Sequence, residues 1–159
     1  MNSMDDTGVV AGPGSGQTSH THRLLRLAGT GFIATLAAMA ATTLAAALAG
    51  AVGVDFEVPD GGEAIPLPGF TVVTGFFSVV GIVIAGALLR WSARPAERFV
   101  QTAVSLTAIS LVPPLLSAAN TATIIALPVL HLVAATVMIP TLVRSLGTIT
   151  SSATPSSHQ

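Results

Sequence analysis

The feature that most constrains this chain is a set of four long apolar runs without charged side chains. The first covers 27–54 and is 28 residues long, and the others cover 70–89, 99–116 and 123–143. A helix needs about 20 apolar residues to cross a hydrocarbon core of roughly 30 Å. Strands of membrane barrels instead alternate apolar and polar residues over about ten positions. The sequence therefore predicts an all-α membrane protein, a bundle of four transmembrane helices with disordered termini.

The composition supports a bilayer as the solvent and excludes several classes of function. Hydrophobic residues make up 51% of the chain and charged residues 8%, whereas soluble domains have about 25% charged residues. The net charge of −1 leaves no basic field for nucleic acid, so we expect none as a partner. Cysteine is absent, which excludes disulfides, thiolate nucleophiles and cysteine-based metal sites.

The arginines predict the orientation of the bundle. An even number of spans puts all six on one side: Arg23 and Arg26 before the first run, Arg90, Arg94 and Arg98 in the interval 90–98, and Arg144 after the fourth run. The opposite interval, 55–67, carries four carboxylates and no basic residue. By the positive-inside rule, we expect a multi-pass protein of the cytoplasmic membrane with both termini in the cytoplasm.

A cleaved signal peptide is the main alternative for the first run, because Ala47, Leu48 and Ala49 before Gly50 resemble a small-residue cleavage site. The apolar stretch that ends there begins at residue 27 and is 23 residues long, well beyond the roughly 7–15 of a signal peptide. We therefore favour a retained first span.

Polar segments flank the membrane domain, which we place at 23–144. Residues 1–22 and 145–159 are rich in small polar residues, and we expect them to be disordered cytoplasmic tails. The acidic outer loop 55–67 could gather a divalent cation, since hard cations take oxygen ligands. Its spacing matches no EF-hand pattern, so we favour a solvated loop and expect no metal site or cofactor.

His131 is the one ionisable residue deep in a predicted span, close to the middle of the bilayer. Its neighbours at i±3 and i±4 carry no hydrogen-bonding side chain, so a partner must come from another helix. Counting inward from the outer ends brings a hydroxyl layer to its level: Thr42 or Thr43, Ser78, Thr107 and Ser110. We favour a structural bond within the bundle over a substrate contact or proton sensor, since no carboxylate accompanies the imidazole.

Prolines and small residues predict how the helices are shaped and packed. Kinks or early ends are expected near Pro113 and Pro114 in the third span, and kinks at Pro128 and Pro140 in the fourth. We favour ordinary kinks over the broken helices of transporters, because the first two spans show no matching break. The first span carries a stripe of small residues that allows close packing without specifying a partner: Thr30, Ala34, Ala38, Thr42, Ala46 and Gly50.

Three segments carry a resemblance to a known family. They read GVDFEV at 53–58, SLVPPLLSAANTAT at 110–123 and LHLVAATVMIPTLVR at 130–144. Over residues 24–145 the chain resembles an actinobacterial family of small four-helix membrane proteins of unknown function. The resemblance implies a four-helix membrane fold and transfers no catalytic residue.

These observations favour an uncharacterised membrane protein that is not an enzyme, because no HExxH, GxSxG, Walker or GxGxxG motif is present. We expect an accessory or structural component whose partners are the bilayer and itself or another membrane protein. The alternative is a small transporter or channel subunit that uses His131 and the hydroxyl layer. An intramembrane enzyme ranks third.

Overall fold

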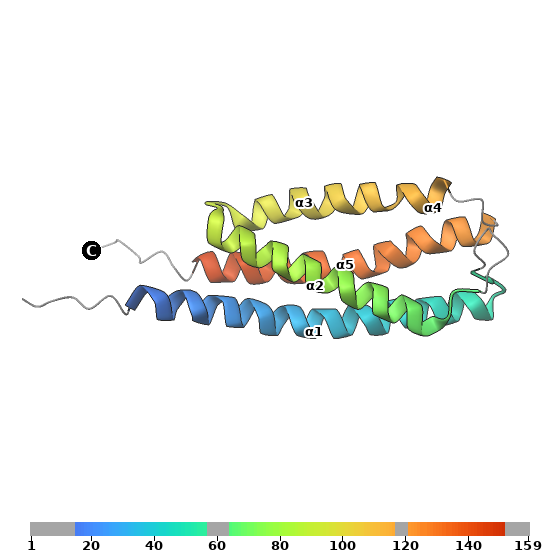
Figure 1. The fold of residues 1–159 in the computed structure, drawn as a ribbon, viewed down its shortest axis with the longest axis horizontal. Helices are drawn as coiled ribbons and strands as arrows, with labels where there is room; N and C mark the ends of the chain where they lie inside the picture. Colours follow the sequence, from blue (N-terminus) through green and yellow to red (C-terminus); the bar gives the residue numbers. More distant parts are fainter. Residues whose placement is uncertain (1–14, 57–63, 117–120, 152–159) are drawn as a thin grey trace, which may run out of the picture.

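The computed structural model consists of helices in the parts of the chain that it describes, residues 15–56, 64–116 and 121–151. They run back and forth along one long axis (Figure 1). Their bounds are α1 (Ser15–Ala51), α2 (Leu67–Trp91), α3 (Pro95–Ser110), α4 (Val112–Leu116) and α5 (Thr121–Ser151). The all-helical prediction is confirmed.

Three of these helices, α1, α2 and α5, are long and apolar enough to cross a membrane. The expected third span, 99–116, is divided between α3 and α4 by a turn at Leu111. Pro113 and Pro114 lack the N–H groups that would donate to the carbonyls of Ile109 and Ser110, so the helix ends where those bonds are missing. Neither piece reaches the length of a span by itself.

The long helices extend beyond the expected spans. α1 begins at Ser15 and so includes part of the expected N-terminal tail, and α5 continues to Ser151 instead of ending at residue 143. A helix that is already formed adds residues at little cost, and Leu146 and Ile149 are buried in the core. The outer parts of both expected tails, and residues 57–63 of the acidic loop, lie outside the described residues.

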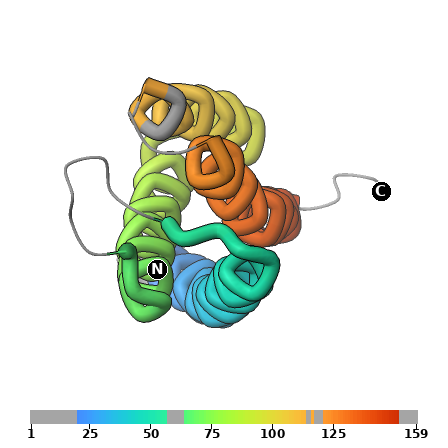
Figure 2. The backbone as a smooth tube through the Cα atoms, turned by 90° about the vertical axis from the view of Figure 1, so that its right-hand side faces the viewer, coloured from blue at the N-terminus to red at the C-terminus, as the bar shows by residue number. Residues whose placement is uncertain are grey.

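The bundle has a three-helix core and an edge. α1 packs along both α2 and α5, whereas α3 packs on α5 and on α2 and makes no contact with α1 (Figure 2). The middle of the small stripe of α1 is buried: Ala34, Ala38, Thr42 and Ala46 are at most 3% exposed, whereas Thr30 is half-buried and Gly50 is exposed. Residues without bulk thus let two helices approach α1 closely.

The exposure pattern is the reverse of a water-soluble bundle. Large apolar side chains such as Phe32, Val72 and Phe76 are more than 60% exposed, while hydroxyls such as Thr42 and Ser78 are buried. Exposed apolar surface of this extent requires an apolar solvent. Together with the three long apolar helices, this indicates a membrane protein.

Candidate functional site

His131 and Ser110 join the edge helix to the core. His131 lies on α5, half-buried, and its Nε2 is 2.7 Å from Oγ of Ser110, the last residue of α3. The predicted partner on another helix is therefore present.

The hydrogens of this bond follow from the second contact of Ser110. Its hydroxyl donates to the carbonyl of Thr107 at 2.8 Å, and a hydroxyl has one hydrogen to give. The imidazole must then donate from Nε2–H, with Ser110 Oγ as acceptor. The arrangement is a short chain from the imidazole through the hydroxyl to a backbone carbonyl, and it holds His131 in the Nε2–H tautomer while the ring is neutral.

This chain of bonds sits where α3 ends. The N–H of Leu111 donates to the same Thr107 carbonyl at 3.2 Å, so that oxygen accepts from both the backbone and Ser110. The two prolines of α4 begin two residues later. The bond to His131 therefore fixes α3 to α5 immediately before the backbone loses its regular hydrogen bonds.

The other predicted members of the hydroxyl layer do not gather at His131. Thr107 contributes its carbonyl to Ser110. Ser78 is buried on α2, three residues before Gly81. A Cβ added to Gly81 would lie 4.0 Å from Leu142, so these two residues are at the same level of the bundle. Leu142 is 11 residues beyond His131, so at 1.5 Å per residue Ser78 lies about 12 Å further along the bundle.

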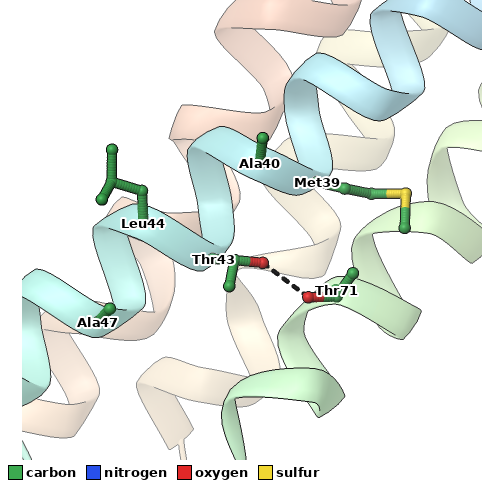
Figure 3. A pocket seen from close by; sticks show the side chains of 6 residues that line it. All are labelled: Met39, Ala40, Thr43, Leu44, Ala47 and Thr71. Carbon is green, nitrogen blue, oxygen red and sulfur yellow. Dashed lines mark hydrogen bonds between the residues drawn. The ribbon is translucent and has the colours of Figure 1, made fainter.

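Thr43 pairs instead with Thr71, a residue that the sequence did not single out. Their hydroxyl oxygens are 2.6 Å apart and link α1 to α2 (Figure 3). The expected first span ended at residue 54 and the second began at 70, whereas α1 ends at Ala51 and α2 begins at Leu67. Thr71 lies ten residues before Gly81, close to the level of His131, so Thr43 lies at the predicted level but bonds to α2. Thr42, next in sequence, is 3% exposed, and its hydroxyl has no hydrogen-bond partner among the described residues.

An open hollow surrounds the Thr43–Thr71 pair on the outside of the bundle. It has a volume of about 510 Å³ and lies between α1 and α2. Figure 3 shows Leu44 pointing away from α2 and Met39 reaching toward it. The lining is otherwise small: Ala40, Ala47 and the two threonines. This surface can receive an apolar side chain or an acyl chain, and its only polar groups are already bonded to each other.

The prolines and the arginines occupy distinct regions. Pro128 and Pro140 lie inside α5, which continues as a helix through both. The arginines all lie toward one end of the bundle, where α1 begins, α2 passes into α3 and α5 ends (Figure 1): Arg23, Arg26, Arg90, Arg94, Arg98 and Arg144. Asp55 lies at the opposite end, directly after α1.

Among the described residues, no three histidine, cysteine or carboxylate side chains lie close enough together to hold a metal ion. The described residues do not include three of the four carboxylates of the acidic loop, Glu57, Asp60 and Glu63. The alternative of a divalent cation bound by this loop therefore stays a prediction.

Comparison with known proteins gives one match. A family model described as "Family of unknown function (DUF6069)" matches residues 22–148. Neither the curated proteins nor the solved structures contain a significant match to the chain.

Proposed function

This chain belongs to the DUF6069 family of unknown function, and we propose that it is a four-span membrane protein whose role is assembly and not catalysis. It lies in the cytoplasmic membrane with both termini in the cytoplasm, and it packs with itself or with another membrane protein.

The alignment of α3 with α4 supports a fourth span. The two helices are nearly collinear and together extend from the turn after α2 to the opposite end of the bundle, packed on α5 (Figure 1). Pro95–Ser110 and Val112–Leu116, with Leu111 between them, make 22 residues, about 33 Å at 1.5 Å per residue. Residues 99–116 carry no charge. This length matches a hydrocarbon core of roughly 30 Å.

The end of the bundle that carries the arginines supports a cytoplasmic location for both termini. Positive side chains are retained on the cytoplasmic side during insertion, and the six arginines all lie toward the end that holds both described chain ends. The described residues of the opposite end carry one charged group, Asp55.

The observation that carries an assembly role is the small-residue hollow between α1 and α2. Helices associate in lipid by close packing of small residues, because lipid tails and apolar side chains are equally apolar. α1 already buries one small face inside the bundle, and this hollow offers a second small surface on the outside. The polar groups of the described spans also serve helix packing, as the pairs Thr43–Thr71 and Ser110–His131 illustrate.

The test is extraction of the chain from native membranes in mild detergent, followed by mass and composition analysis of the particle. We expect a homo-oligomer or a stoichiometric complex, and Ala47→Trp, which fills the hollow, should reduce the particle to the single chain. As a control, Phe76→Trp changes an apolar side chain that is already exposed and should leave the particle intact. A single chain in the unmodified particle would contradict the assembly role.

The half-buried imidazole at the α3–α5 contact supports a transporter or channel subunit as a second candidate. Ionisable residues inside membranes often mark solute or proton pathways. Reconstitution of the purified chain into liposomes tests this candidate, with His131→Ala as the comparison. Solute or proton flux that is lost in the variant, while assembly survives, would favour transport. Equal flux with and without the protein would exclude it.

A further inference from the structure

The end of the bundle that carries the arginines places Arg23 and Arg90 on neighbouring helices. Arg23 lies one turn before Leu27, which is fully buried, so both residues share the inner face of α1. Arg90 lies one turn beyond Gly86, and a Cβ on Gly86 would be 3.9 Å from Leu24 of α1. Arg90 therefore lies on the side of α2 that faces α1, close to the level of Arg23.

These two cations have no carboxylate beside them in the described part of the chain. The carboxylates described are Asp55, at the far end of the bundle, and Glu97. Glu97 is engaged by Arg94, whose Nη1 is 3.4 Å from its Oε2. Two guanidinium groups at the same end of neighbouring helices create a positive surface that attracts anions. The arrangement of Arg23 and Arg90 thus offers a site for an anion from outside the described fold.

The depth of the pair indicates which anion. Arg90 lies 23 residues beyond Leu67, about 35 Å along α2, which is just past a hydrocarbon core of roughly 30 Å. Trp91 follows it and is 78% exposed, and exposed tryptophans in membrane proteins lie at the level of the headgroups. A guanidinium fork matches the oxygens of a phosphate.

We propose that Arg23 and Arg90, beside Trp91, bind the phosphate of an anionic phospholipid in the cytoplasmic leaflet. The site rests on the proposed membrane orientation and goes beyond it, because it assigns a ligand to two of the six arginines. Arg94 is excluded from the site, because Glu97 already neutralises it.

The purified full chain is titrated in mild detergent with dioleoylphosphatidylglycerol and with dioleoylphosphatidylcholine, and bound lipid is counted by native mass spectrometry. The variants are Arg23→Gln, Arg90→Gln and both together, with Arg94→Gln as the matched control. We expect the anionic lipid to bind more tightly. Each of the two substitutions should weaken it about fivefold and the pair about 25-fold, from the typical contribution of an arginine at an anionic surface. Arg94→Gln should change binding less than twofold.

Equal affinity for the two lipids, or an equal loss in Arg94→Gln and Arg90→Gln, would overturn the proposal. Alkaline carbonate extraction of the source membranes separates this failure from that of the proposed function. A chain that stays in the membrane but shows no lipid preference overturns the lipid site alone. A chain released by carbonate overturns both.

Discussion

The three-helix core and the α3–α4 edge are held by different means. Within the core, α1 buries a face of alanines and threonines against α2 and α5, so van der Waals packing along the whole helix stabilises it. α3 has two buried residues, Pro95 and Phe99, both in its first turns. At its other end the Ser110–His131 bond joins it to α5. The core is therefore fixed by close packing along whole helices, whereas the outer half of the edge has no fully buried described residue and is joined to α5 by lighter packing and the Ser110–His131 bond.

The largest effect is expected from a cavity in the core. Leu142 is fully buried, and Leu142→Ala should lower the free energy of unfolding by about 2 kcal/mol. This value is at the lower end of the range measured for leucine-to-alanine substitutions in soluble proteins. Lipid is as apolar as the protein interior, so the loss comes from van der Waals packing and from the cavity, and not from transfer into water. Unfolding by SDS in bicelles measures it. Leu132→Ala on the same helix, at a site 45% exposed, should cost much less, and equal costs would contradict a packed core.

Overpacking of the α1–α2 contact should follow. A Cβ on Gly31 would lie 2.7 Å from Cγ1 of Ile82, so Gly31→Val should cost about 1–2 kcal/mol in the same assay. Gly29 lies on the same helix with nothing within 4 Å of that position, and Gly29→Val is the matched control. A loss of equal size in the two variants would show that helix propensity, and not the contact, is responsible.

A smaller effect is expected at the edge. Ser110→Ala should cost about 0.6 kcal/mol, the typical value of a polar contact between membrane helices. Hydrogen exchange should rise in α3 and not in α1. A double-mutant cycle with His131→Leu checks that the cost is the shared bond, and Ser105→Ala, at an exposed site on α3, should have no effect. Additive costs in the cycle would contradict a direct bond.

The smallest effect is expected at the Thr43–Thr71 pair. Thr43→Val should cost a few tenths of a kcal/mol, because Thr71 can turn its hydroxyl to a backbone carbonyl of its own helix. Several threonines of α5, such as Thr141, already do so. Thr136→Val removes a bond within α5 at an exposed site and is the control. If Thr43→Val lowered the free energy of unfolding by more than Ser110→Ala does, the proposed ranking of the two polar contacts would be wrong.

The sequence predicted the parts of this structure that depend on composition along one helix. Uncharged runs identified the three long helices, and the lack of local partners showed that His131 must bond to another helix. That partner is Ser110, which the count of residues from the outer ends of the helices had placed at the level of His131. The stripe of small residues predicted close packing of α1, and four of its six residues are buried.

Relations between helices were harder to predict, because they depend on where each helix begins and ends. Ser78 lies about 12 Å further along the bundle than His131, because α5 begins further toward the outer end than α2 and equal counts from the two starts reach different levels. Thr43 bonds to Thr71 and not to His131. The division of 99–116 into α3 and α4 followed from Pro113 and Pro114, which had been expected to end or kink the helix.

The most direct test of the account is whether α3 and α4 cross the bilayer together. The chain has no cysteine, so single cysteines can be placed without further changes. Ala93→Cys marks the turn between α2 and α3, and Thr121→Cys marks the start of α5. A membrane-impermeant maleimide applied to intact cells should label Thr121→Cys and leave Ala93→Cys unlabelled until the cells are opened. Labelling of both cysteines from the same side would contradict a fourth span and, with it, the four-span architecture.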